Sequence, residues 1–392
     1  MDYHATTPVD PRVLDAMLPY FTEKFGNAAS RQHEFGWIAE DAVETARASI
    51  AHNLGALNKE ILFTSGATES NNLAIKGIAE LWQQKGNHII TVTTEHKSVI
   101  DSCRRLEKNG IHITYLPVNS DGLIDLNRLQ ESISPKTIFV SIMAANNEIG
   151  TIQDIAQIGK ICHDKNVFFH TDATQAAGKI PINVQSMNID LMSFSAHKIY
   201  GPKGTGALYV RSSNPKVRLA MQLDGGGHEH GFRSGTLNVP AIVGFSKAFE
   251  LSIQSMENEM NRLRDYRDTM LDEFSKNLDE IYLNGDPINR LPNNLNLSFL
   301  HVEDNALMMA MKDIAVSTGS ACSTADPEPS HVLKALGLPP ERLHSSLRFG
   351  LGRFTTEEEV HYVIGRVIEN VKKLRALSPT YKKNYQPSIT IK

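Results

Sequence analysis

The sequence has few of the residues that mark disulfide-rich, secreted or membrane-spanning proteins. Its 392 residues include three cysteines, Cys103, Cys162 and Cys322, which are too few and too scattered for a disulfide framework. It contains no run of about 18 apolar residues, so no membrane-spanning helix is expected. The first residues have neither the basic nor the apolar region of a secretory signal. These absences favour a reducing, cytoplasmic location, in which each thiol is interpreted from its own surroundings.

Excess charge of one sign is also lacking. The formal net charge is -4 and the isoelectric point is about 6.4, which argues against nucleic acid or an anionic membrane as a partner. Hydrophobic residues make up 41% and charged residues 21% of the chain, as in ordinary globular proteins. Because a single core stops growing near about 250–300 residues, a chain of this length predicts two domains.

Between residues 61 and 210, apolar segments of strand length alternate with helical stretches. Several segments are apolar on both faces, as expected for strands that helices cover on both sides. The pattern predicts an α/β fold with a mostly parallel sheet and helices on both faces. The last two segments are joined by a turn too short for a helical crossover, which favours an antiparallel pair. The predicted strands are 61–64, 88–92, 111–116, 137–142, 167–170, 191–194 and 207–210.

A smaller α+β domain is expected after this block. Residues 241–276 have the apolar spacing of one long helix that leaves the large domain. A strand at 295–300, a helix at 304–312 and a strand at 315–317 then suggest a new βαβ unit. We expect a large domain at 12–258 and a small domain formed by 1–11 and 259–392.

Polar residues follow four of the predicted strands, where open α/β sheets collect ligands. Lys198 precedes a glycine-rich turn, and a desolvated lysine there is a candidate for a Schiff base. Asp172 can face a protonated ring nitrogen. The hydroxyl-rich segment 64–72 leads into a helix start that suits a phosphate. His96 can stack on an aromatic ring.

Each of these four signals has an ordinary structural alternative. On position alone, Lys198 is more often a solvated loop residue and Asp172 more often a helix cap, while segment 64–72 is equally a plain capping motif. A lone histidine such as His96 is often structural. Together, however, the four strand ends provide a phosphate cradle, a stacking ring, a carboxylate and a lysine. That set predicts a site for pyridoxal 5'-phosphate (PLP).

On these residues the chain resembles the class V, fold-type I PLP-dependent enzymes, and among them the cysteine desulfurases that supply iron–sulfur cluster assembly. The similarity runs from residue 5 to residue 358. Its most specific motifs are SAHKIYGPKG at 195–204, RSGT at 233–236 and GSACS at 319–323. The resemblance implies a fold-type I PLP-dependent transferase and a homodimer with shared active sites.

The resemblance also implies a role for each matching residue. For the cofactor, Lys198 should form the Schiff base, Asp172 should face the ring nitrogen, Gln175 should face the ring hydroxyl, and His96 should stack on the ring and help proton transfer. The phosphate should be bound by Ala67, Thr68, Ser195 and His197, and by Thr236 of the neighbouring subunit. The substrate should be held by Asn147 and Arg348, with the planar guanidinium forked onto its carboxylate.

Cys322 is the expected acceptor of sulfur. Small and turn-forming residues surround it, which predicts an exposed, mobile loop at about 318–332. Cys103 and Cys162 lie in helical stretches and are interpreted as structural. The expected reaction takes sulfur from L-cysteine, gives L-alanine and leaves a persulfide on Cys322. An iron–sulfur scaffold or another sulfur-acceptor protein is then the expected partner.

A metal site and three other functions are the alternatives to this interpretation. The His228-Glu229-His230 segment has the spacing of metal ligands, but no further ligand cluster stands nearby, so no intrinsic metal is expected. Cys322 is a candidate only for a transient iron–sulfur ligand. A PLP-dependent aminotransferase or a selenocysteine lyase is the nearest alternative, and a transaminase has no use for Cys322. A sulfur-carrier or scaffold protein without catalytic activity would need no Lys198.

Overall fold

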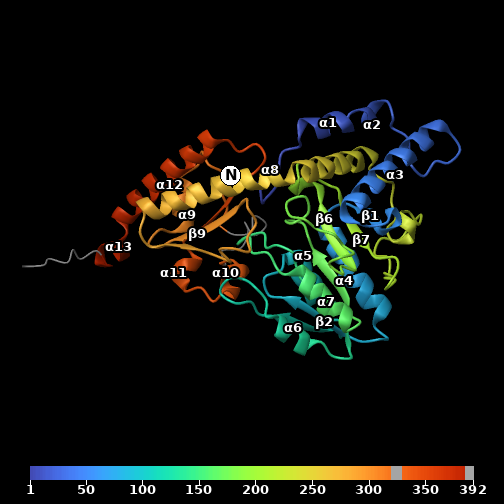
Figure 1. The fold of residues 1–392 in the computed structure, drawn as a ribbon, viewed down its shortest axis with the longest axis horizontal. Coiled ribbons are helices and arrows are strands. Elements are labelled where there is room, and N and C mark those ends of the chain that lie inside the picture. Colours follow the sequence, from blue (N-terminus) through green and yellow to red (C-terminus); the bar gives the residue numbers. More distant parts are fainter. Residues whose placement is uncertain (319–328, 385–392) are drawn as a thin grey trace, which may run out of the picture.

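The computed structural model describes residues 1–318 and 329–384, apart from the side chains of residues 382–384. Two lobes are joined by the long helix α8 (Val239–Asn277), which runs across both of them in Figure 1. Its first half contributes Phe245 and Phe249 to the core of the larger lobe, and its second half contributes Leu263 and Phe274 to that of the smaller. The helix predicted at 241–276 is therefore confirmed. The domain boundary that we propose, residue 258, falls inside it.

The larger lobe is built on a seven-stranded sheet with the order β1-β7-β6-β5-β4-β2-β3. The five strands from β6 to β3 pair in parallel, whereas β7 is antiparallel to both β6 and β1. All seven predicted strands and the antiparallel final pair are confirmed. The strands are β1 (Ile61–Thr64), β2 (His88–Val92), β3 (His112–Leu116), β4 (Thr137–Ser141), β5 (Phe168–Asp172), β6 (Leu191–Ser195) and β7 (Gly206–Val210).

Helices cover both faces of this sheet because successive strand residues point to opposite sides. Ile61 and Phe63 pack into one core and Leu62 into the other. The first face is covered by α1 (Pro11–Met17), α3 (Glu34–Leu54), α6 (Leu126–Ser132), α7 (Ile155–Asp164) and α8, the second by α4 (Ala67–Trp82) and α5 (Lys97–Glu107). The short elements of this lobe are α2 (Pro19–Thr22), η1 (Asn58–Glu60), η2 (Ala196–Lys198) and η3 (Glu229–Gly231). Cys103 and Cys162 are buried in α5 and α7, as expected for structural cysteines.

The smaller lobe has an antiparallel sheet with the order β10-β9-β8. The βαβ unit expected here is wrong, because the chain after α9 touches the free edge of β10 only through an isolated bridge between Ser317 and Arg348. The predicted α/β fold with a smaller α+β part is nevertheless confirmed. The elements of this lobe are β8 (Ile281–Leu283), β9 (Asn294–Phe299), α9 (Asp304–Ala310), α10 (His331–Ala335), α11 (Pro340–Leu343), β10 (Ser346–Gly350), α12 (Glu357–Leu377) and α13 (Pro379–Asn384).

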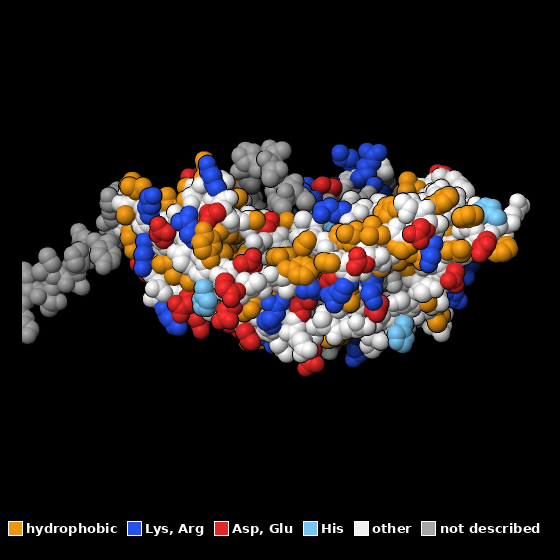
Figure 2. Space-filling model, turned by 90° about the horizontal axis from the view of Figure 1, so that it is seen from above, with side chains coloured by type: hydrophobic (Ala, Val, Ile, Leu, Met, Phe, Trp, Pro, Cys, Tyr) orange, Lys and Arg blue, Asp and Glu red, His pale blue; other side chains and the backbone are white. Residues whose placement is uncertain are grey.

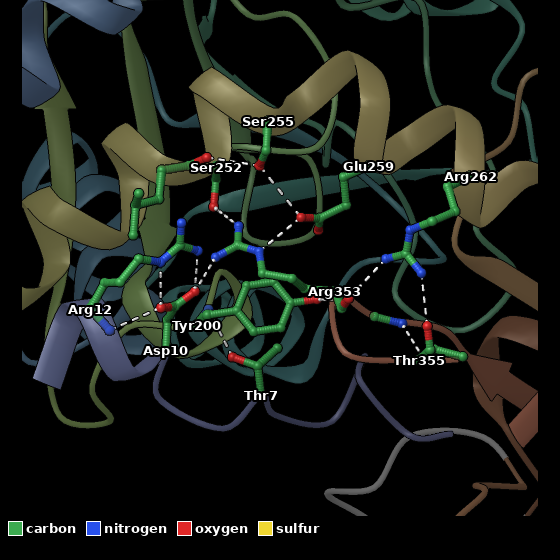
Figure 3. Close-up of polar contacts among 12 residues, drawn as sticks. Thr7, Asp10, Arg12, Tyr200, Ser252, Ser255, Glu259, Arg262, Arg353 and Thr355 are labelled. Carbon is green, nitrogen blue, oxygen red and sulfur yellow. Dashed lines mark hydrogen bonds and ion pairs between the residues drawn. The ribbon is translucent and has the colours of Figure 1, made fainter. Parts of the chain in front are cut away.

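A buried polar network joins the two lobes (Figure 3). Arg353, which follows β10, donates to Asp10 at 2.9 Å and to Glu259 of α8 at 2.8 Å, and its guanidinium lies 4.2 Å from the centre of the Tyr200 ring. Hydrogen bonds from Arg12 and Arg353 hold the pKa of Asp10 below its ordinary value. The N-terminal segment, α8 and the chain after β10 are thereby fixed to one another.

No helix in the described part of the chain is both long enough and apolar enough to cross a membrane.

Substitution of Gly206, the first residue of β7, tests the close packing beneath the carboxyl ends of the strands. A Cβ atom at this position would lie 2.7 Å from the Gly66 Cα and 2.7 Å from the Phe194 carbonyl oxygen. We therefore expect Gly206→Ala to destabilise the protein by about 1–3 kcal/mol, through displacement of backbone that cannot give way cheaply. Urea unfolding of the variant and the wild type measures the difference.

Gly365, within α12, is the matched control, because a Cβ atom there meets nothing within 4 Å. Gly365→Ala should leave stability unchanged or raise it by up to about 1 kcal/mol. A Gly206→Ala protein as stable as the control variant would contradict the packing argument.

Candidate active site

A cavity of about 510 Å³ lies between the carboxyl ends of the strands, the N-terminal segment and β10. Its volume is in the range of small-molecule sites. Thr236 is exposed and does not line this cavity, and Cys322 lies outside the described residues. The other residues predicted for the site line the cavity: Ala67, Thr68, His96, Asn147, Asp172, Gln175, Ser195, His197, Lys198 and Arg348.

Lys198 ends η2, the short turn that follows β6. Its Nζ donates to the carbonyl oxygens of His4 at 2.6 Å and Ala5 at 2.7 Å. The Thr7 hydroxyl holds the two segments together, because it donates to the His197 carbonyl oxygen at 3.0 Å and accepts from the Tyr200 N–H at 2.8 Å. The N-terminal segment therefore fixes the direction in which the lysine enters the cavity.

Asp172 and His96 are tied together by one amide. Asn71 Nδ2 donates to Asp172 Oδ2 at 2.7 Å and to Ser98 Oγ at 2.9 Å. Ser98 Oγ in turn lies 2.8 Å from His96 Nδ1, which also accepts from the Ser98 N–H at 3.1 Å. These two donors favour the tautomer that carries its proton on Nε2. Asn71, from α4, was not predicted as a site residue.

One end of the cavity, where the sequence predicts the phosphate, is formed by the first turn of α4. Gly66 precedes the helix with φ 149°, and no side chain caps the N–H groups of the first turn. Such N–H groups and the positive end of the helix dipole favour an anion. His197 and Lys203 also line this part, and burial together with Lys198 and Lys203 lowers the pKa of His197 to about 4.

Gln175 lies among residues that the sequence analysis missed. Its Oε1 accepts from Lys179 Nζ at 3.0 Å and lies 3.0 Å from His4 Nδ1, while its Nε2 donates to the His4 carbonyl oxygen at 3.0 Å. Because a carbonyl oxygen can only accept, the main chain of His4 fixes which side of the amide is the nitrogen. Burial and the nearby Lys198 lower the pKa of Lys179 to about 7.

Arg348 reaches the cavity from β10 and is 1% exposed. Its guanidinium donates to the Asn147 carbonyl oxygen at 2.8 Å and to Asp2 Oδ1 at 2.8 Å. Its Nε is buried and has no partner among the described residues. A planar cation held in this way presents further N–H groups to an incoming carboxylate.

These groups fit PLP. The cavity has an anion-binding helix start at one end, a lysine amine, and a carboxylate suited to a pyridinium nitrogen. The buried hydroxyl of Thr174 also lines it and has no partner within the described part of the chain. A bound cofactor would give such an orphaned polar atom a partner.

Comparisons with known proteins agree with this geometry. The family model of the class-V aminotransferases matches residues 1–363. The chain belongs to the class-V aminotransferase family. A cysteine desulfurase IscS from Rickettsia rickettsii (strain Iowa) is 56% identical over 381 residues, which cover 97% of this chain and 93% of that protein. Another IscS, from Anaeromyxobacter sp. (strain Fw109-5), is 57% identical over 97% of this chain and 94% of its own length.

Solved structures of the class-V family share the fold. A NifS-like protein superposes with a TM-score of 0.88 and 36% sequence identity, covering 95% of this chain and 98% of its own. The predictions of the family, of an enzyme and of PLP as its cofactor are confirmed. The roles predicted for individual residues stay proposals.

His170, in β5 below the cavity, gives a pH-dependent prediction. It is completely buried between Ser141 Oγ at 2.8 Å and Ser193 Oγ at 2.9 Å, and burial lowers its pKa to about 4. The unfolded chain takes up this proton near pH 6.5, so the stabilisation is complete above that pH and is lost as the pH falls toward 4. We expect the free energy of unfolding to fall over this window, by at most about 3 kcal/mol from this residue.

Urea unfolding between pH 7.5 and 4.5 measures how the free energy of unfolding changes with pH for the wild type and for His170→Gln. The variant should be less stable at pH 7.5, but its free energy of unfolding should change less with pH. His361→Gln, at an exposed position on α12, should keep the wild-type slope. Equal slopes in the wild type and His170→Gln would contradict the assignment.

Proposed function

We propose that the protein is a cysteine desulfurase, which takes sulfur from L-cysteine with PLP, releases L-alanine and leaves a persulfide on Cys322. The observation that carries the proposal is that Lys198, Asp172 and Arg348 line one cavity in a chain whose relatives are cysteine desulfurases. An aminotransferase would use the same three residues. The cysteine at position 322 has a use only in sulfur or selenium transfer, and no relative reported above favours a selenocysteine lyase.

The described residues on either side of the Cys322 segment attach beside the cavity. Before it, Ser317 Oγ donates to Asp2 Oδ2 at 2.9 Å. After it, Ser330 donates to Glu148, and His331 Nε2 lies 2.9 Å from the Glu95 carbonyl oxygen. Cys322 is five residues beyond Ser317, a span of at most about 18 Å. Both attachments support a thiol that reaches the bound substrate.

When bound, PLP supplies an electron sink that stabilises negative charge at the substrate α-carbon. The Lys198 amine holds the cofactor and then takes the α-proton at Nζ. His96 exchanges protons through Nε2, on the side away from Ser98. Asp172 would face the ring nitrogen and Gln175 the ring hydroxyl, while Ala67, Thr68, Ser195 and His197 would hold the phosphate.

Arg348 and Asn147 orient the substrate, with the guanidinium on its carboxylate. The Cys322 thiolate attacks the substrate sulfur, because the thiolate and not the thiol is the nucleophile. An S–S bond forms and the C–S bond breaks, and its electron pair stays with the β-carbon, which a proton then converts to the methyl group of alanine. The persulfide passes to an iron–sulfur scaffold or another sulfur-acceptor protein in a reducing cytoplasm.

A homodimer with shared active sites is part of the proposal. Large apolar side chains are exposed on one stretch of the chain from α1 to the start of α3: Leu14, Leu18, Phe21, Phe25, Phe35 and Trp37. Apolar side chains gather on the face seen in Figure 2, the side on which α1 and α2 lie in Figure 1. Exposed apolar patches of this kind mark protein–protein contacts.

Thr236 gives a second reason for a dimer. It is exposed, yet Arg233 of the same loop donates to Glu69, which lines the phosphate end of the cavity, at 2.8 Å. The buried Glu229, which precedes it in the chain, pairs with Arg47 of α3 at 2.8 Å and accepts from the Phe63 N–H of β1 at 2.6 Å. The loop is thus held in place while Thr236 faces outward, where it contacts the phosphate of a second subunit.

Cys322→Ala tests the proposed sulfur transfer. We expect the variant to bind PLP, with the visible absorption of the wild type, but to lose sulfide release from L-cysteine in the presence of a reductant. Mass spectrometry of the wild type after exposure to L-cysteine should find one additional sulfur atom on the Cys322 peptide. Cys103→Ala is the matched control, since the buried thiol of Cys103 has no role in transfer. Undiminished turnover by Cys322→Ala would exclude the desulfurase mechanism.

Phe21→Glu combined with Phe25→Glu tests the dimer. We expect light scattering to give the mass of two chains for the wild type and of one chain for the double variant, because two buried charges oppose association. Ile288→Glu changes an apolar residue that is 86% exposed outside this surface and should leave the dimer intact. A wild-type protein that is monomeric would disprove shared active sites.

A further inference from the structure

We propose that Asp2 is a positioning residue for Arg348, which it aims at the carboxylate of the substrate amino acid. The inference rests on the proposed function, because it assigns to Arg348 the recognition of L-cysteine. It adds a residue that touches neither cofactor nor substrate and works through the guanidinium alone.

The backbone holds Asp2 opposite Arg348. The Gly350 N–H donates to the Met1 carbonyl oxygen at 2.9 Å, and the Tyr3 N–H donates to the Gly350 carbonyl oxygen at 3.1 Å. This bridge runs along the free edge of β10. A Cβ atom at Gly350 would lie 2.9 Å from the His4 nitrogen, so only glycine permits this approach. The position of the carboxylate is therefore set by main-chain hydrogen bonds.

The two oxygens of Asp2 have different partners. Oδ1 accepts from an Arg348 terminal nitrogen at 2.8 Å, and Oδ2 accepts from Ser317 Oγ at 2.9 Å. Ser317 lies on the same edge of β10, where its carbonyl oxygen accepts from the Arg348 N–H at 2.7 Å. Ser317 thus prevents rotation of the carboxylate, and the carboxylate can hold the guanidinium in one orientation.

The guanidinium is consequently held at two points. One terminal nitrogen donates to Asp2 and the other donates to the Asn147 carbonyl oxygen at 2.8 Å. Each terminal nitrogen retains a second N–H, and Nε donates to no group in the described part of the chain. Because Arg348 lines the cavity, the second N–H of each terminal nitrogen is left for a forked contact with a carboxylate.

Charge explains why a carboxylate stands at this position. Arg348, Lys179 and Lys198 are close enough to lower the pKa of the buried His4. Without a compensating anion, this group of cations would repel one another and push the long Arg348 side chain out of place. Asp2 pairs with Arg348 through a single terminal nitrogen at 2.8 Å, so it compensates the charge and occupies only one N–H of the guanidinium.

The test measures ligand binding and needs no sulfur transfer. L-Alanine, the product with a carboxylate, and ethylamine, which lacks one, are titrated into the PLP-loaded protein while its visible absorption is followed. We expect Asp2→Ala to weaken L-alanine binding about tenfold, as for a lost hydrogen bond to a charged group, and to leave ethylamine binding unchanged. Asp2→Asn keeps an acceptor for Arg348 and a polar partner for Ser317 but loses the charge, so it should weaken L-alanine binding about threefold, less than Asp2→Ala does.

Asp279→Ala is the matched control. Asp279 pairs at 2.6 Å with Arg375, a buried arginine of the smaller lobe that does not line the cavity. This variant should bind L-alanine as the wild type does. Unchanged L-alanine binding in Asp2→Ala would overturn the proposal, as would equal losses for both ligands or an asparagine variant as weak as the alanine variant. A wild type that takes up no PLP would instead refute the proposed function itself.

Discussion

The arrangement of the whole site depends on one buried cation, Arg353, which is shared between carboxylates from two other parts of the chain. A charge removed from water is costly unless it is paired and hydrogen-bonded, so the side chain is stable only where Asp10 and Glu259 meet it. Arg353 lies five residues after Arg348, so holding Arg353 in place also limits the movement of Arg348, which lines the cavity. Loss of either carboxylate would leave the charge only partly compensated and weaken the attachment of the chain after β10.

The N-terminal segment connects this ion-pair network to the end of the cavity where Lys198 lies. Between Asp10 and Asp2 it contacts the backbone at His197 and supplies two carbonyl oxygens to Lys198. It then reaches Gln175 through His4. A segment without regular secondary structure thus connects groups that belong to separate lobes. Its hydrogen bonds, and not those of the sheet alone, set the distance between the lysine and the arginine.

Much of the fold was predictable because the strands carry their own pattern. The seven strands of the large sheet are apolar runs bounded by polar residues. Asp172 ends β5 and Lys198 lies three residues after β6, at the edge where ligands collect. The prediction of a strand at 315–317 was wrong, because a short apolar run does not show whether the edge of a sheet is available for pairing. The role of Cys322 stays a prediction.

The residues that sequence reasoning missed share a physical cause. Asp2, His4, Asn71 and Lys179 act through side chains or backbone from distant segments, with separations such as 346 residues between Asp2 and Arg348. Their local sequence has no feature that reveals the partner. Lys179 comes closest to being detectable from the sequence, because it lies only four residues after Gln175, a spacing that permits their contact.

The amide of Asn71 has a mechanical consequence. Because a single nitrogen bridges Asp172 and Ser98, and Ser98 holds the imidazole of His96, the carboxylate and the imidazole form a connected unit. Displacement of either group is therefore transmitted to the other through Asn71, which α4 carries.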